Sequence, residues 1–147
     1  MIKIITVGKV RSKELAQLIE FYRKQIPRKT EIITLKDEAN IDGMEKEGLA
    51  ILKVIKPEDF VITLEIKGKN ITSEELASLI DKIEIETKGN IVFVIGGSYG
   101  LSSEVSLRSN YKLSFSKMTF PHQLMQVFLT EQIYRAYAIL QNHPYHK

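Results

Sequence analysis

The sequence predicts an α/β fold, with a mostly parallel sheet of five to six strands and helices on both of its faces. Two observations carry this prediction. Segments with strand character and segments with helical spacing alternate along the whole chain, and residues 91–95 (IVFVI) show no polar alternation. Such a run is typical of a strand buried on both faces of a parallel sheet, so it is expected at the centre. With 147 residues and neither linker nor repeat, a single domain over 1–147 is expected.

Local patterns predict each element in turn. The strands are expected at 2–8, 31–36, 60–66 and 91–95, with a short strand ending near 115. The helices are expected from Ser12 to Pro27, over 43–55, from Thr72 to about 88, after a cap at Ser102 or Ser103, and over 123–140. Lys67-Gly68-Lys69 is expected to stop the third strand. Thr72 and Glu75 have the spacing of a capping box.

Composition excludes several classes of site. The chain has no cysteine, which rules out disulfides, thiolate zinc sites and a cysteine nucleophile, and only three histidines, so we expect no metal. The first residues are too short an apolar run for a signal peptide, and no run of 18 apolar residues suggests a membrane span. A cytoplasmic protein without a membrane partner is expected.

Charge is distributed unevenly along the chain. The net charge of +3 divides into +6 for residues 1–30, −6 for 31–90 and +3 for 91–147. Two basic ends can assemble a positive surface that attracts a polyanion such as RNA. Ordinary solvated helix faces explain the same pattern, and both interpretations remain open.

Three loops are candidates for a ligand site, because ligands bind beyond the carboxyl ends of parallel strands. They follow residues 66, 95 and 115. The second loop, GGSYGLSSE at 96–104, allows close approach of its backbone to a ligand but lacks the spacing of a triphosphate or dinucleotide loop. The third, LSFSKMTFP at 113–121, offers apolar side chains and hydroxyls. Together they suit an adenosine, although the glycines also fit a plain turn.

The last helix and the tail are unusual. Between 124 and 140 only Glu131 and Arg135 are charged, so we expect burial on several sides, most simply against a two-fold related subunit. A surface ion pair is the plainer interpretation of these two residues. The ending NHPYHK concentrates two histidines and a tyrosine in its last five residues, which suggests a contact.

Four segments, VIGGSYGLS, LSFSKMTFPHQL, EQIYRA and HPYHK, together resemble the SPOUT-class methyltransferases. More narrowly, the chain resembles the bacterial family that methylates N3 of a pseudouridine in 23S rRNA. The resemblance covers nearly the whole chain and is weaker near 36–43, where the chain is shorter than the family pattern. It implies a C-terminal trefoil knot, S-adenosyl-L-methionine as cofactor, a homodimer, and a target in a domain IV stem-loop at the subunit interface of assembled ribosomes.

The resemblance also implies site residues. Those expected to bind the cofactor are Leu64, Gly96, Phe115, Ser116, Lys117, Met118, Thr119 and Phe120. Because N3 must lose a proton, the catalytic candidates are His122, Tyr145 and His146 as proton acceptors or positioning groups, and Arg135 as a cation for a phosphate or the base anion. His143 ranks lower. Alternatively, His122 merely begins a helix and the tail only packs on the dimer.

Two rival functions remain open. One is a non-catalytic ribosome-binding factor, which would not bind S-adenosyl-L-methionine. The other is a SPOUT methyltransferase that acts on transfer RNA, since a fold does not fix its substrate.

Overall fold

The computed structural model describes residues 1–38 and 40–147, within which five strands alternate with five helices. The strands are β1 (Ile2–Val7), β2 (Thr30–Leu35), β3 (Phe60–Asn70), β4 (Ile91–Ile95) and β5 (Tyr111–Ser114). The helices are α1 (Lys13–Gln25), α2 (Gly43–Lys53), α3 (Ser73–Glu86), α4 (Ser103–Arg108) and α5 (His122–Leu140). The predicted elements are all present, with ends that mostly differ by one or two residues.

The five strands form one sheet in the order β2-β1-β4-β3-β5, and every pair of neighbours is parallel. This confirms the predicted α/β class and the central place of β4. Ile4 on β1 and Ile62 on β3 both lie opposite Phe93 on β4. The three side chains form a buried apolar row across the middle of the sheet.

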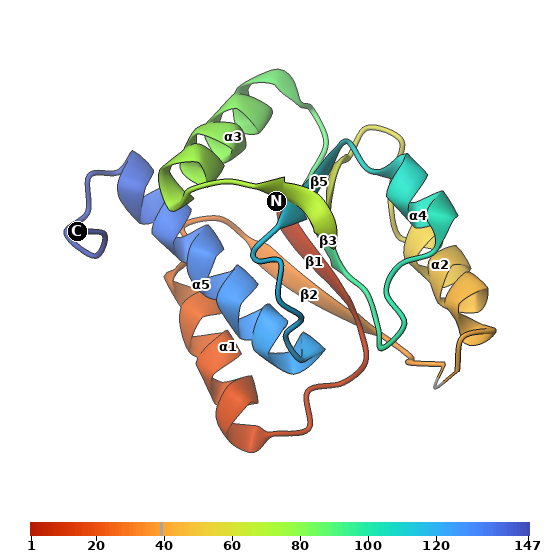
Figure 1. The fold of residues 1–147 in the computed structure, drawn as a ribbon. Helices are drawn as coiled ribbons and strands as arrows, with labels where there is room; N and C mark the ends of the chain where they lie inside the picture. The colour runs from red at the N-terminus through yellow and green to blue at the C-terminus, as the bar shows by residue number, and fades with distance from the viewer. Residues whose placement is uncertain (39) are drawn as a thin grey trace.

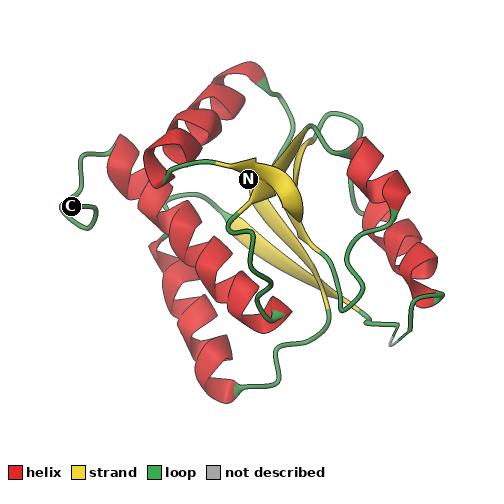
Figure 2. Ribbon diagram, viewed as in Figure 1, coloured by secondary structure: helices red, strands yellow, loops and turns green. Residues whose placement is uncertain are grey.

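Helices cover both faces of the sheet. Helices α1, α3 and α5 lie on one side, whereas α2 and α4 lie on the other (Figures 1 and 2). Alternate residues of β4 serve the two cores: Phe93 packs with Leu129 and Ile133 of α5, and Val94 belongs to the core that contains Ile51 of α2. Burial of β4 on both faces therefore explains why residues 91–95 show no polar alternation, as the sequence suggested.

The end predicted for the third strand is wrong, because β3 continues through Lys67 to Asn70. β5 pairs with β3 as far as Leu64 and again at Lys69, so residues 65–68 form an irregularity in the ladder. A Cβ on Gly68 would lie 2.8 Å from the backbone of Lys112. Glycine here permits close approach of two backbones rather than ending the strand.

The capping predictions are confirmed. Ser12, Thr72 and Ser102 each accept a hydrogen bond from a backbone N–H in the first turn of the helix that follows. The side chain of Glu75 also returns to the backbone of Thr72, which completes the predicted capping box.

Helix α5 owes most of its burial to its own chain. It lies against the sheet between α1 and α3, which cover its flanks (Figure 1). Phe128, on its outer side, remains 38% exposed. The apolar composition of α5 therefore does not by itself require a partner subunit, contrary to the argument from sequence.

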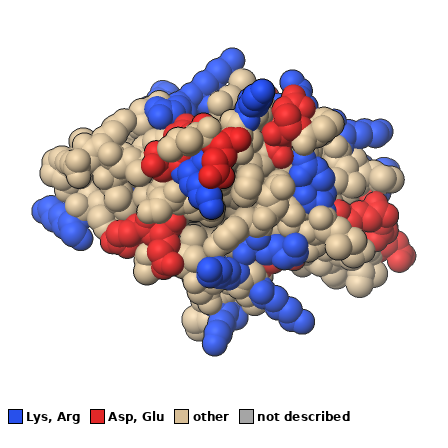
Figure 3. All heavy atoms as spheres, turned by 90° about the horizontal axis from the view of Figure 1, so that it is seen from above, with Lys and Arg blue, Asp and Glu red and all other residues tan. Residues whose placement is uncertain are grey.

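Both signs of charge are interspersed on the face of the molecule seen in Figure 3, as on an ordinary solvated surface. The described helices include none long and apolar enough to cross a bilayer.

Replacing Phe93 with alanine should lower the free energy of unfolding by about 3–5 kcal/mol, because the fully buried ring (0% exposed) would leave a cavity at the centre of the sheet. Urea unfolding measures the change. Ile85→Ala, at a side chain that is 77% exposed, is the matched control and should cost less than about 0.5 kcal/mol. A similar loss in both variants would contradict this account of the core.

Candidate active site

A cavity of about 700 Å³ opens where β4 and β5 end, beside residues 64–66 in the middle of β3. We call it the glycine-loop cavity. Its walls come from residues 64–66, 95–101 and 113–122. Two of the walls are the loops after β4 and β5, which the sequence predicted as candidates, and the structure brings them together. The third wall is residues 64–66 of β3 rather than the loop predicted after residue 66, because β3 continues to Asn70.

The glycine loop forms one wall. Gly100 has φ +85°, a conformation that side chains with a Cβ rarely adopt, and its N–H donates to the Gly97 carbonyl over 3.0 Å. A Cβ on Gly96 would lie 2.8 Å from the backbone carbon of Gly100. The loop is therefore a tight turn, and its three glycines all belong to the lining of the cavity.

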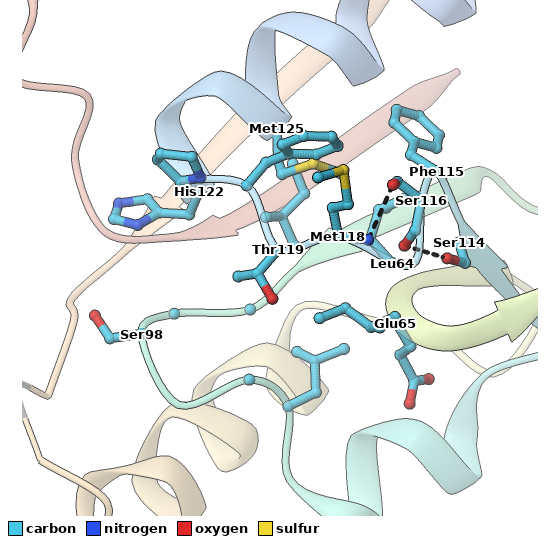
Figure 4. A pocket seen from close by; sticks show the side chains of 18 of the residues that line it. Leu64, Glu65, Ser98, Ser114, Phe115, Ser116, Met118, Thr119, His122 and Met125 are labelled. Carbon is cyan, nitrogen blue, oxygen red and sulfur yellow. Dashed lines mark hydrogen bonds between the residues drawn. The ribbon is translucent and has the colours of Figure 1, made fainter.

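The segment from Ser114 to Phe120 forms the opposite wall (Figure 4). The Ser114 hydroxyl donates to the Ser116 carbonyl over 2.9 Å, and the Met118 N–H donates to the Ser116 hydroxyl over 3.0 Å. These bonds fold the segment back on itself. Of the predicted cofactor residues, Leu64, Gly96, Phe115, Ser116, Met118, Thr119 and Phe120 line the cavity. Lys117 is exposed on the same segment and is absent from the lining.

His122 lies at one end of the cavity, as the first residue of α5 (Figure 4). Its Nε2 would be 3.0 Å from a Cβ on Gly8, where φ is +97°. Glycine at position 8 therefore allows the imidazole to pack against the loop after β1. Gln123 holds the same loop by accepting a hydrogen bond of 3.0 Å from the Arg11 N–H.

The other three catalytic candidates form a separate cluster around the tail. Glu131 accepts hydrogen bonds from the Tyr145 hydroxyl (2.8 Å) and from Arg135, which confirms the predicted pair of Glu131 and Arg135. His146 lies 3.1 Å from Arg135 through Nδ1 and 2.7 Å from Glu74 through Nε2. Because arginine only donates, Nδ1 accepts and Nε2 carries the hydrogen given to Glu74.

Phe115 and Phe120 separate the tail cluster from His122. Both residues line the glycine-loop cavity and also a second one of about 670 Å³, the tail cavity, to which Arg135 and Tyr145 belong. Within one chain, the four catalytic candidates are therefore not assembled around one cavity.

Burial, followed by the hydrogen bond to Glu131, raises the pKa of Tyr145 above its ordinary value. The phenol therefore keeps its proton at neutral pH. In this arrangement Tyr145 is a hydrogen-bond donor, which suits positioning better than proton abstraction.

Sequence reasoning missed a carboxyl pair behind the glycine loop. Glu47 is only 7% exposed, and its carboxylate accepts the Glu38 N–H over 2.7 Å. Oxygens of Glu47 and Asp37 would each lie 3.3 Å from a Cβ on Gly97, and Asp37 accepts from the Ser98 hydroxyl over 3.4 Å. The sequence does contain an indication that Glu47 is buried, because it lies one turn before buried Ile51 on the apolar face of α2.

No cluster of three or more acidic or histidine side chains suited to a metal ion occurs within residues 1–38 and 40–147.

Comparisons with known proteins agree with this geometry. A family model described as "Predicted SPOUT methyltransferase" matches residues 1–146. A protein of Acholeplasma laidlawii named "Ribosomal RNA large subunit methyltransferase H" is 55% identical over 146 residues, which cover 99% of each chain. The chain belongs to the ribosomal RNA large subunit methyltransferase H family of SPOUT methyltransferases. Methyltransferases of this class generally use S-adenosyl-L-methionine.

Two further likenesses complete the comparison. A relative of the same name from Clostridium botulinum (strain Hall) is 51% identical over 157 aligned positions, with 99% of each chain covered. Since 157 exceeds 147, this chain lacks segments that the relative has. The sequence placed such a shortening near 36–43, where residue 39 lies outside the described residues.

A structure of a "probable methylase family protein" from Haemophilus influenzae Rd KW20 has a TM-score of 0.60 at 15% identity, covering 99% of this chain and 70% of that one. That likeness supports the fold alone.

Replacing Glu47 with glutamine should make stability less dependent on pH. Burial raises the pKa of Glu47 above 4.5; the hydrogen bond from the Glu38 N–H opposes this shift, and the neighbouring Asp37 reinforces it. The folded state therefore binds this proton more readily, and the free energy of unfolding falls as pH rises from about 4.5 through the folded pKa. Glutamine keeps an acceptor for the Glu38 N–H without the charge. The stability of Glu47→Gln relative to wild type should increase between pH 4.5 and 7.5 in urea unfolding. Exposed Glu45→Gln is the control, and equal pH profiles for Glu47→Gln and wild type would refute the explanation.

Proposed function

We propose that the protein binds S-adenosyl-L-methionine in the glycine-loop cavity. It transfers the methyl group to N3 of a pseudouridine in a domain IV stem-loop of 23S rRNA, at the subunit interface of assembled ribosomes. The observation that carries the proposal is a cavity of about 700 Å³ built from residues 64–66 of β3 and the loops after β4 and β5, in a chain of this family. Its size lies within the roughly 300–1,000 Å³ usual for small-molecule sites.

The cavity offers what this cofactor requires. Leu64, Phe115 and Phe120 supply apolar surface for an adenine, and the glycine loop supplies backbone donors and acceptors for the polar edges. Residues 115–120 are the wall nearest to the start of α5. The cofactor-binding residues proposed are those of the sequence prediction, with Lys117 assigned to the rim because its side chain is exposed.

Methyl transfer from a sulfonium is an in-line displacement, so alignment of the methyl group with N3 is the main requirement. Well-oriented reactants can gain about 7–11 kcal/mol from alignment. N3 carries a proton that must leave before it becomes an effective nucleophile. His122 is the one of the four catalytic candidates that lines the cavity in its own chain, and we assign it to proton acceptance or positioning.

In a homodimer, the tail of one subunit could reach the site of the other. Arg135, Tyr145 and His146 lie beyond the wall of Phe115 and Phe120 in their own subunit, so we propose that they act on the nucleotide held by the partner. Arg135 would contact a phosphate or the base anion. Leu18 and Phe128, exposed beside the tail cavity, give this face the apolar character of an interface.

The direct test is to incubate ribosomes that lack the modification with purified protein and labelled S-adenosyl-L-methionine, and then to map the labelled nucleotide. One labelled pseudouridine in domain IV of 23S rRNA is the expected result. Label in transfer RNA alone would favour the rival methyltransferase. Failure to bind the cofactor in calorimetry would favour a ribosome-binding factor without catalysis.

Removal of residues 145–147 should abolish methylation while leaving cofactor affinity within about twofold, because the tail lies outside the glycine-loop cavity. Gly96→Val is the complementary variant, since its side chain would collide with Gly100 and obstruct the cofactor. Each homodimer should be inactive. Mixed dimers of the two should regain one working site, because an intact tail meets an intact cavity across the interface. Normal methylation by the truncated protein would remove the tail from the mechanism, and no recovery in mixed dimers would refute action across the interface.

A further inference from the structure

A third hollow, of about 540 Å³, opens at the carboxyl ends of β1 and β2. The loop after β1, the end of β2 and the start of α5 form its walls. Three exposed cations, Lys9, Arg11 and Lys36, belong to its lining, and we call it the basic hollow. The sequence indicated that residues 1–30 are basic without showing where the charges gather.

The cations of the basic hollow are available to a ligand. Within the part of the chain that the structure describes, Lys9, Arg11 and Lys36 form no ion pair, whereas Arg23, Arg28 and Arg135 each pair with a glutamate.

The one acid among the lining residues is Asp37. Its carboxylate accepts the Ser98 hydroxyl and lies against Gly97, so it is engaged with the glycine loop. The hollow therefore keeps an excess of positive charge, which suits an anion.

His122 connects the basic hollow to the glycine-loop cavity, because it lines both. The close contact of its ring with Gly8 and the bond between Gln123 and the Arg11 N–H hold the loop after β1 against α5. His122 thus borders the cations of the basic hollow as well as the cavity, at whose end it lies in Figure 4.

We propose that the basic hollow binds the phosphate backbone of the RNA substrate. Lys9, Arg11 and Lys36 contact phosphates next to the target nucleotide, whose base enters the glycine-loop cavity past His122. The inference rests on the proposed methyltransferase function and assigns to it an RNA-contacting surface. Phosphate contacts of this kind release counterions, so they make affinity depend steeply on salt.

The test compares two triple variants with equal loss of charge. Lys9→Gln, Arg11→Gln and Lys36→Gln together neutralise the basic hollow. Lys29→Gln, Lys56→Gln and Lys88→Gln neutralise three exposed lysines that precede β2, β3 and β4, at the opposite end of the sheet. Binding to unmodified ribosomes is measured against monovalent salt at fixed Mg²⁺, and cofactor binding is measured by calorimetry.

Neutralising the basic hollow should weaken ribosome binding at least about tenfold and reduce the slope of log affinity against log salt by about 2 to 3. Cofactor affinity should stay the same, which also shows that the variant is folded. The control triple should change ribosome affinity less than about threefold. Exchanging each cation for the other type, Lys9→Arg, Arg11→Lys and Lys36→Arg, should largely restore binding.

Equal losses in the two triple variants would attribute binding to overall charge and overturn the inference. Full ribosome affinity in the basic-hollow variant would also overturn the inference. The proposed function would still stand in that case if the wild-type protein methylates ribosomes. Failure of the wild-type protein to bind cofactor or ribosomes would instead refute the proposed function itself, and the inference with it.

Discussion

The hydrogen-bonded register of β1, β4 and β3 is the constraint on which the rest of the molecule depends. It aligns Ile4, Phe93 and Ile62 in one buried row, so β1 and β4 end side by side at one edge of the sheet, and β3 continues past that edge. Each loop that builds the glycine-loop cavity or the basic hollow starts from that edge or from the neighbouring strands β2 and β5. Parallel pairing therefore gathers segments that lie far apart in the sequence.

The wall of Phe115 and Phe120 divides the molecule functionally. On one side His122 borders a cavity with little charge, and on the other Arg135 is already paired with Glu131. A partly buried cation with a carboxylate partner attracts an anion weakly until that pairing is relaxed. The tail adds to the restraint, since Tyr145 donates to the same Glu131 carboxylate. The isolated subunit therefore holds its tail in a closed network, and contact with a nucleotide requires some of these bonds to exchange.

The sequence predicted the elements and the location of the cavity because those follow from local patterns and from the geometry of parallel sheets. Residues 91–95 and the Thr72 capping box are examples. The prediction of the end of β3 was wrong because it depends on a segment distant in sequence. Gly68 was expected to end the strand, but it instead allows the backbone of β5 to approach β3 closely. Sequence reasoning also missed Glu47, whose burial depends on the glycine loop and Asp37. The trefoil knot, implied by resemblance, stays a prediction.

The low charge of the glycine-loop cavity suits the proposed chemistry. Glu65 is the one carboxylate among its lining residues, and the hydroxyls of Thr63 and Ser106 donate to it over 2.6 Å and 3.0 Å. A sulfonium bound in this cavity would therefore meet mostly apolar surface. Methyl transfer from a sulfonium to a deprotonated nitrogen consumes both charges. Surroundings that solvate ions poorly destabilise the charged reactants more than the neutral products, so an apolar wall favours the reaction as well as the fit.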